Sequence, residues 1–270
     1  MNNWFSMSNF ILKKDIPDII QWGIENGFNG VELWADAPFL FVDNTNRDIL
    51  STIAENSNEI KFSVHSPLYG INISSVNPGI RKESVRQIKK IFEWKKYLHL
   101  EHVVIHPGYS PSSDKNIIEK VYENFAETII DIINTAEKSG VIILLENIGI
   151  DNKYIDREYD FFLKISDRFN LDICLDTGHL NVAWKTPLIL EGIKQRIKAY
   201  HISDNFGIAD EHLPVGEGNI SWEMYAKNIF NETVPMIHEI NRKGNSGAST
   251  LKSRRNLEKI MKDVSRETSG

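Results

Sequence analysis

Residues 171–182, LDICLDTGHLNV, begin as an apolar run typical of a buried strand. Asp176 ends that run and His179 follows it, so a carboxylate and an imidazole stand immediately beyond the expected strand. Strand alternation places Cys174 on the same side as Asp176, and Gly178 lets the chain bend so that His179 reaches the same place. Short apolar runs that end in an acid or a histidine recur along the chain.

Short β-rich runs alternate with stretches in which apolar residues recur at helical spacing. The runs fall at residues 3–8, 29–34, 60–65, 102–106, 141–146, 171–176, 197–203 and 233–239. The helix-like stretches include 15–26, 80–98, 115–138, 158–168 and 250–265, and the helix signal is weakest around 187–196 and 221–230. Eight such units in 270 residues predict an α/β fold, a (β/α)8 TIM barrel forming a single domain over residues 1–270. A doubly wound open sheet is the alternative.

The composition is that of an ordinary soluble globular protein, with 41% apolar and 25% charged residues. Apolar runs fall short of the roughly 20 residues that span a bilayer. The first residues, MNNWFSMSNFILKKD, lack the basic region and long apolar core of a signal peptide. Together with a single cysteine, which cannot form an internal disulfide, these features favour a cytoplasmic protein without a membrane partner.

Charge is distributed unevenly along the chain. The net charge is −6, yet from Arg242 onward eight Lys and Arg residues face three Asp and Glu residues. We expect a basic C-terminal helix from about residue 249, which we interpret as a solvated helix face. The same segment could close the barrel or contact a second subunit, so a homo-oligomer is also open. The acidic remainder disfavours broad electrostatic capture of nucleic acid.

Acids and histidines stand at or just after the ends of six expected strands, and in a barrel these ends meet around one mouth. The set is His65, His106, Glu146, Asp176, His179, His201, Asp210, His212 and Glu239. A lone histidine at a strand end is more often a core or rim residue, so the prediction depends on the whole set. These strand ends supply no Lys or Arg neighbour, and crowded carboxylates without a cation would repel one another. A divalent metal resolves this conflict, because imidazole and carboxylate ligands suit zinc, manganese or iron.

The complete set resembles the xylose isomerase-like barrel superfamily over approximately residues 3–240. This superfamily embraces sugar and sugar-phosphate isomerases and epimerases, and also endonuclease IV, which cuts DNA at abasic sites with three zinc ions. All nine positions match the zinc ligands of endonuclease IV in residue type. The resemblance therefore implies a divalent metal cofactor, Zn or Mn, with one to three ions.

The motifs favour the sugar branch of this superfamily. The chain has D-T-G-H where endonuclease IV has D-T-C-H, and its second βα loop, WADAPFLFVD, is acidic and aromatic where the nuclease has basic and polar residues. By contrast, NGVELW, HISDN and DEHLPVGEGNI resemble the isomerase and epimerase branch. That branch commonly uses a four-ligand core, which corresponds here to Glu146, Asp176, His201 and Glu239.

The resemblance implies a metal-dependent isomerase or epimerase that acts on a small-molecule carbohydrate through a metal-stabilised enediolate. Glu146 and Glu239 would be the two opposed catalytic carboxylates, and His179 would steady an oxygen or bind metal.

Aromatic residues in the mouth loops could bind the substrate, although packing at the rim explains each of them equally well alone. These candidates are Trp34, Tyr69 and Trp184, and Tyr69 resembles, with shifted spacing, the tyrosine that helps fill the abasic gap in endonuclease IV. The alternative function is an endonuclease IV-like multi-zinc phosphodiesterase, an AP endonuclease with nucleic acid as its partner. A barrel that binds a sugar or a metal without turnover is a third reading.

Overall fold

The computed structural model describes residues 1–10, 15–40, 42, 43, 45, 47–150, 153–156, 159–184, 187–241 and 246–268. Within these residues, eight parallel strands close into a barrel in the order of the sequence, because β8 pairs with β1. The strands are β1 (Asn3–Ser6), β2 (Gly30–Trp34), β3 (Lys61–His65), β4 (Leu100–Ile105), β5 (Ile143–Glu146), β6 (Asp172–Asp176), β7 (Ile197–Ile202) and β8 (Met236–His238). The predicted (β/α)8 barrel is confirmed, and the open doubly wound sheet was wrong because the two edge strands pair with each other.

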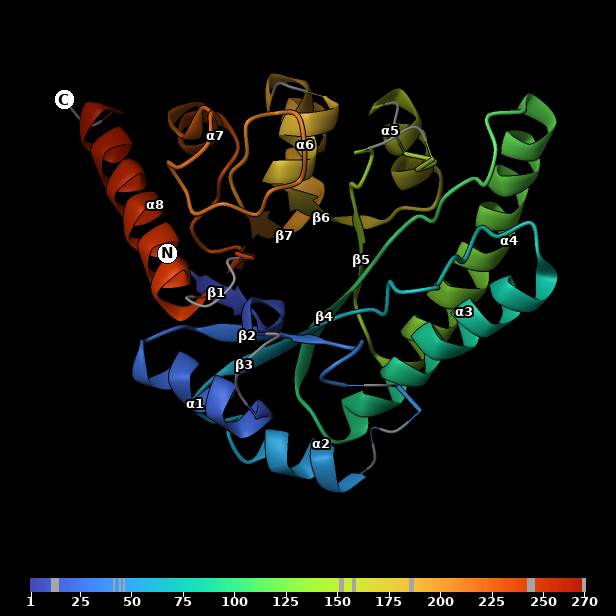
Figure 1. The fold of residues 1–270 in the computed structure, drawn as a ribbon, viewed down its shortest axis with the longest axis horizontal. Helices are drawn as coiled ribbons and strands as arrows, with labels where there is room; N and C mark the ends of the chain where they lie inside the picture. Colours follow the sequence, from blue (N-terminus) through green and yellow to red (C-terminus); the bar gives the residue numbers. More distant parts are fainter. Residues whose placement is uncertain are drawn as a thin grey trace.

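Helices surround the strands in a ring, with α1 and α2 on one side and α5, α6 and α7 on the opposite side (Figure 1). They are α1 (Ile16–Glu25), α2 (Arg47–Ala54), α3 (Pro78–Phe92), α4 (Lys115–Ser139), α5 (Tyr159–Arg168), α6 (Thr177–Ala183), α7 (Trp222–Asn228) and α8 (Ser246–Thr268). The basic C-terminal helix expected from about residue 249 therefore begins at Ser246.

One helix differs from the expectation. The stretch around 187–196 forms a 3-10 helix, η3 (Pro187–Arg196), and the α-helix of that unit is α6, directly after β6. The reason is local: the Asp176 carboxylate accepts a hydrogen bond from the backbone N–H of His179 and so starts a helix at the end of the strand itself.

The ends of α4 follow from the sequence. Asp114 precedes the helix, and its side chain accepts hydrogen bonds from the backbone N–H groups of Asn116 and Ile117. Gly140 follows the helix with a φ of 66°, a left-handed conformation that favours glycine. These two residues define the longest helix that covers the barrel.

The barrel interior is filled by a small apolar cluster, separate from the large core between strands and helices. Its members are Trp4, Val104, Leu144, Cys174, Ala199 and Ile237. Because alternate residues of a strand face the same side, the residue two positions after each of the last five also faces the barrel axis. Those residues are His106, Glu146, Asp176, His201 and Glu239. The apolar cluster therefore lies directly below the polar residues of the mouth along the barrel axis.

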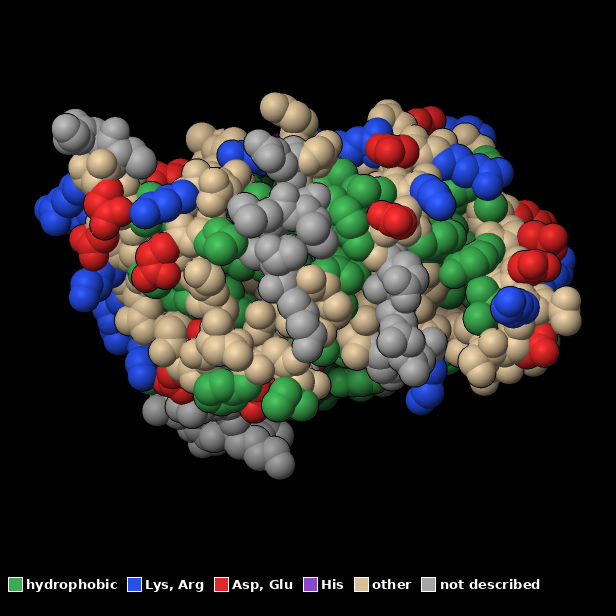
Figure 2. All heavy atoms as spheres, turned by 90° about the horizontal axis from the view of Figure 1, so that it is seen from above, with side chains coloured by type: hydrophobic (Ala, Val, Ile, Leu, Met, Phe, Trp, Pro, Cys, Tyr) green, Lys and Arg blue, Asp and Glu red, His purple; other side chains and the backbone are tan. Residues whose placement is uncertain are grey.

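On the face seen in Figure 2, basic and acidic side chains lie beside one another toward both ends of the molecule, with hydrophobic side chains between them. Charges of both signs are thus interspersed on this face. Among the described residues, no helix combines the length and the apolar composition that a bilayer crossing requires.

Candidate metal centre

The nine predicted ligands come together at the mouth of the barrel. In the described part of the chain they form four overlapping groups, and the potential ligand atoms within each group all lie within 4.8 Å of one another. Glu146, Asp176 and His201 form the deepest part of the centre, since their side chains are at most 1% exposed. Asp210 and Glu239 lie nearer to solvent, each with a side chain that is 18% exposed.

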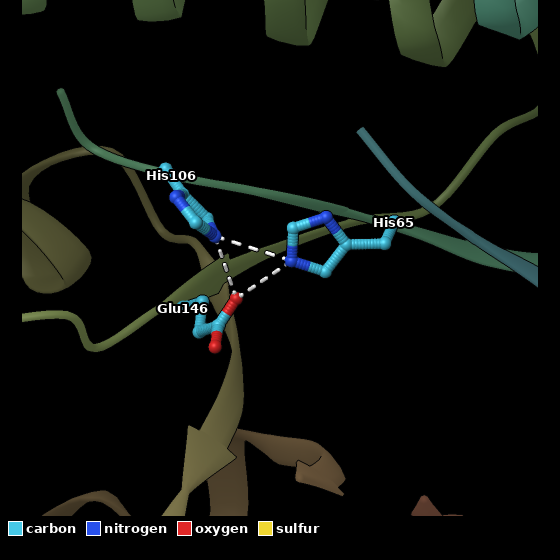
Figure 3. Close-up of side chains that lie close together, drawn as sticks. All are labelled: His65, His106 and Glu146. Atoms are coloured by element: carbon cyan, nitrogen blue, oxygen red, sulfur yellow. Dashed lines mark hydrogen bonds and ion pairs between the residues drawn. The ribbon is translucent and has the colours of Figure 1, made fainter. Parts of the chain in front are cut away.

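The first group joins the ends of three neighbouring strands (Figure 3). The Nε2 atom of His65 lies 3.3 Å from Oε2 of Glu146, and Nε2 of His106 lies 3.0 Å from the same oxygen. The two Nε2 atoms are 3.2 Å apart. Both imidazoles therefore point at one carboxylate oxygen, an arrangement in which a single cation could contact all three side chains.

The second group surrounds Nδ1 of His201 with carboxylates. This nitrogen lies 3.0 Å from Oε1 of Glu146, 3.4 Å from Oε2 of Glu239 and 3.8 Å from Oδ2 of Asp176. The strand register explains the meeting, because Asp176 pairs directly with His201 and Glu146 is a register neighbour of Cys174 on the same side. Asp176, His201 and Glu239 form one of the four groups, and Glu146 reaches it through His201. The family resemblance implies these four residues as a ligand core.

The third group lies on the loop between β7 and α7. Oδ2 of Asp210 lies 2.8 Å from Nε2 of His212 and 3.3 Å from Nε2 of His179. His212 adopts a φ of 48°, an uncommon left-handed conformation for a non-glycine residue. The loop thus brings two of its own side chains to a histidine that follows β6.

Backbone carbonyl groups fix the tautomers of three histidines. The Nδ1 atoms of His65, His179 and His212 lie 2.8, 2.9 and 3.0 Å from carbonyl oxygens. Those carbonyls belong to Ser66, Asn147 and Glu239, respectively. A carbonyl oxygen can only accept, so each Nδ1 carries the hydrogen and each Nε2 faces the centre. This is the arrangement that a metal-binding imidazole needs.

The histidines of the centre respond to the surrounding carboxylates. Burial opposes protonation, yet Glu146 raises the pKa of His65 to about 9, and Asp210 raises the pKa of His212 to about 10. Burial is likewise outweighed at His179, whose pKa is raised well above its usual value by Asp176 and Asp210. His106 differs, because burial lowers its pKa although Glu146 lies 3.0 Å away. Without a metal, protons on His65, His179 and His212 therefore offset the charge of the carboxylates.

The pKa values of the carboxylates in the centre shift in both directions. Burial alone would raise the pKa of Glu146, but the His201 and His106 side chains lower it well below the usual value. Burial raises the pKa of Asp176 to about 6, and the nearby carboxylates of Asp210 and Glu146 add to the shift. Negative charge is therefore in excess around Asp176.

The residues present fit a divalent metal. Oδ2 of Asp176 and Oδ1 of Asp210 are buried and have no hydrogen-bond partner among the described residues. The ion pairs that the centre's carboxylates form within the described residues are all with histidines, which can give up their protons. Buried oxygens without partners beside imidazoles are suitable donors for zinc or manganese.

A cavity of about 240 Å³ opens above the centre. Trp34 and Tyr69 line it, with their rings 5.6 Å apart, as do Glu146 and Glu239. Trp184, the third aromatic residue predicted to bind substrate, does not line this cavity; its ring packs 5.1 Å from Tyr159 and 5.4 Å from Phe162. Two of the three aromatic candidates therefore face the mouth.

Glu32, a fully buried residue of β2, is not among the site residues predicted from the sequence. Its Oε1 lies 3.0 Å from Nε2 of His201, and Ser63 Oγ donates to Oε2 at 3.4 Å. Burial would raise the pKa of Glu32, but His201 lowers it, so the carboxyl group is ionised. Strand alternation could have found it, because Glu32 lies two positions before Trp34, which faces the mouth.

A second overlooked residue is Asp36, in the loop after β2. Its Oδ2 accepts hydrogen bonds from the backbone N–H groups of Leu68 and Tyr69, at 2.9 and 2.8 Å. Asp36 thus holds the loop that presents Tyr69 to the cavity. An acid within an aromatic loop is a weak sequence signal, because its partners come from another loop.

Two sequence relatives illustrate the range of similar proteins. The chain is 34% identical over 170 residues to the uncharacterized protein MJ1311 of Methanocaldococcus jannaschii, which covers 61% of this chain. That match spans 58% of the relative, less than two thirds of its length. The chain is also 27% identical over 252 residues to a probable endonuclease 4 of Mycoplasmopsis pulmonis, covering 82% of this chain and 87% of the relative.

Solved structures resemble the chain over almost its entire length. A D-tagatose 3-epimerase-like protein superimposes with a TM-score of 0.85 at 26% identity, covering 99% of this chain and 100% of the other. The IolI protein with a bound zinc atom gives a TM-score of 0.82 at 17% identity, covering 98% and 99%, and at this identity it shows the fold alone. The family model described as the xylose isomerase-like TIM barrel matches residues 20–261. The chain belongs to the xylose isomerase-like TIM barrel family.

Proposed function

We propose that this protein is a divalent-metal-dependent isomerase or epimerase of sugars or sugar phosphates. The observation that carries the proposal is the convergence of Glu146, Asp176 and Glu239 around Nδ1 of His201 on the floor of a small cavity. Zinc or manganese would be held by these four side chains. The likeness to a D-tagatose 3-epimerase-like protein over the whole barrel supports this choice.

When bound, the metal would polarise the substrate carbonyl and stabilise the negative charge that develops on its oxygen. Glu146 and Glu239 approach His201 Nδ1 from separate strands, β5 and the end of β8, so they can stand on opposite sides of a bound carbon. One carboxylate removes a proton from carbon, and the other returns a proton to the opposite face or to the adjacent carbon. The first outcome is epimerisation and the second is isomerisation.

Glu146 is ionised, because His201 and His106 lower its pKa, and only the ionised carboxylate can accept a proton. His179 is suited to steady a substrate oxygen, because its raised pKa keeps a positive charge at the mouth. Its Nδ1 lies 3.4 Å from Oε1 of Glu146, so the two side chains act on the same region of the cavity.

The cavity favours a small polar ligand. Its volume of about 240 Å³ is below the roughly 300–1,000 Å³ of pockets that take drug-sized ligands. Trp34 and Tyr69 at its rim offer aromatic faces for the apolar side of a sugar.

A second candidate is a multi-zinc phosphodiesterase that cleaves DNA at abasic sites. It is favoured by the two further groups of ligands, around Oε2 of Glu146 and around Oδ2 of Asp210, which a one-metal isomerase does not need. The similarity to a probable endonuclease 4 also supports it. In that reaction the ions would activate a water molecule and stabilise the leaving oxygen.

One experiment separates these candidates. The purified protein is analysed for metals, and is then given a panel of ketoses and their phosphates in D2O and an abasic DNA duplex. We expect about one tightly bound ion per chain and exchange of a substrate C–H for C–D, seen by NMR. About three zinc ions with cleavage of the duplex would replace the first candidate by the second. Sugar binding without exchange or cleavage would contradict both and indicate a binding protein.

A further inference from the structure

His201 is oriented differently from the other fixed histidines of the centre. His65, His179 and His212 turn Nδ1 toward a backbone carbonyl and Nε2 toward the ligands. His201 turns Nδ1 toward the carboxylates of the core, and its Nε2 lies 3.0 Å from Oε1 of Glu32. A side chain therefore takes the place that a carbonyl group takes at the other three.

We propose that Glu32 is a positioning residue that holds His201 with Nδ1 free to bind the metal. The inference rests on the proposed metal centre. Glu32 does not reach the cavity, since it is fully buried one layer below the ligands and does not line the opening. It acts through His201, by accepting the Nε2 hydrogen, and its negative charge makes the imidazole a stronger donor.

The position of Glu32 is unusual within the barrel. In β5, β6, β7 and β8 the residue at this level is uncharged and belongs to the interior cluster, namely Leu144, Cys174, Ala199 and Ile237. A carboxylate at this level needs a partner, because burying an isolated charge is costly. Oε1 of Glu32 and Nε2 of His201 are both buried and lie 3.0 Å apart, and no hydrogen bond to another described residue competes for either atom.

Cys174, on the neighbouring strand β6, also interacts with His201. A thiol is a weak hydrogen-bond acceptor, whereas an ionised carboxylate is a strong one. Ser63 contacts Glu32 rather than His201, and its 3.4 Å hydrogen bond orients the second carboxylate oxygen. A carboxylate faces each nitrogen of His201, Glu146 at Nδ1 and Glu32 at Nε2, both at 3.0 Å. Glu32 is therefore the group that can keep hydrogen on Nε2 when a metal takes the place of hydrogen at Nδ1.

Three variants test this role, and each is first checked by circular dichroism and thermal unfolding without metal. Glu32→Gln retains an oxygen acceptor but loses the charge. Glu32→Met removes both. Cys174→Ala is the matched control, because it changes a side chain at the same depth against the same histidine. Zinc and manganese affinities are measured by competition with a chromophoric chelator, and 15N-labelled histidine NMR of the zinc-loaded protein reports which nitrogen of His201 carries hydrogen.

We expect Glu32→Gln to weaken metal binding about 10-fold and Glu32→Met about 100-fold, the range found for partners of metal-binding histidines. The Nε2–H signal of His201 should persist in Glu32→Gln and exchange rapidly or disappear in Glu32→Met. Cys174→Ala should stay within about threefold of the parent affinity. If Glu32→Met does not fold, the Gln variant decides the matter.

Equal affinities in the parent and Glu32→Gln, even with a lowered unfolding temperature, would assign Glu32 a purely structural role and overturn the proposal. A parent protein that binds no divalent ion would instead overturn the proposed metal centre, and this role with it. The two failures are therefore distinguishable from the parent measurement alone.

Discussion

Two sets of buried histidines in this barrel behave in opposite ways. His65 and His212, at the mouth, face carboxylates, and their pKa values rise to about 9 and about 10 in spite of burial. His102, one layer below the mouth, and His238, on the outer side of β8, are also buried, and burial lowers their pKa values to about 4 and about 3. Carboxylate contacts outweigh burial at His65 and His212. At His106 burial outweighs the contact with Glu146 and lowers the pKa, so the charge of each imidazole depends on the balance of the two effects.

Position along the strand explains the difference. His102 faces the barrel axis low in β4, with its ring 6.0 Å from that of Trp4. His238 faces outward from β8, with Nδ1 3.1 Å from the hydroxyl oxygen of Ser253 on α8. A histidine one residue away from the mouth, or one layer below it, becomes a neutral packing group.

The largest expected effect concerns the catalytic pair. If Glu239 transfers a proton, Glu239→Gln should reduce turnover of the true substrate by about 10²- to 10⁴-fold, the usual contribution of a general acid or base. The exchange of substrate C–H for C–D, followed by NMR, measures it. The exposed Glu223 on α7 provides a matched control, and Glu223→Gln should leave turnover unchanged. Full activity in Glu239→Gln would remove Glu239 from the mechanism.

Metal binding should release protons from His65 and His212 but not from His102 and His238. Below about pH 9 the metal-free centre holds a proton on His65, and a metal must displace it. Affinity should therefore increase with pH, by about tenfold per pH unit for each proton displaced. Calorimetry in buffers of different ionisation enthalpy counts these protons at pH 7. His102→Phe should leave the number of released protons unchanged. Release of no protons by the parent protein would contradict the prediction that a metal displaces them.

His102 and His65 should contribute to the free energy of unfolding of the metal-free protein with opposite pH dependence. For His102 the folded pKa of about 4 lies below the unfolded value, so its contribution is complete above about pH 6.5 and is lost as the pH falls toward 4. The loss amounts to about 2 kcal/mol at pH 5. For His65 the sign is reversed: its contribution is complete below about pH 6.5 and is lost as the pH rises through about 9. Urea unfolding of the parent and of His102→Phe at pH 5 and pH 7 isolates the first effect, and an identical acid loss in both would refute it.

The smallest expected effect is on stability, and it concerns His238 on the outer side of β8. Ser253→Ala removes the hydrogen-bond partner of His238 and the acceptor of the Val215 N–H, and should lower the free energy of unfolding by about 1 kcal/mol for each hydrogen bond lost. Metal affinity should not change, because His238 faces α8 and not the mouth. A lower metal affinity in Ser253→Ala would show that the contact between His238 and Ser253 influences the metal centre.

Most residues of the candidate centre could be predicted from the sequence, because strand periodicity and strand ends are local patterns. The expected runs and helices matched the barrel to within a few residues, and the nine expected ligands meet at one mouth. Glu32 was overlooked, although it lies in a strand that was recognised, because its partner His201 is 169 positions away and only barrel closure brings them together. The same limit applies to Trp184, whose packing against α5 no local pattern reveals.

The amino-acid sequence alone determined the fold class and the kinds of atoms at the mouth, since alternation and strand-end chemistry depend on neighbours along the chain. Only the tertiary structure decided which nitrogen of each imidazole faces the centre, which acids are deep and which are near solvent, and which carboxylate supports which histidine. Those properties depend on contacts between strands and loops that are distant in sequence, through hydrogen bonds and charges that act only at short range once the barrel has closed.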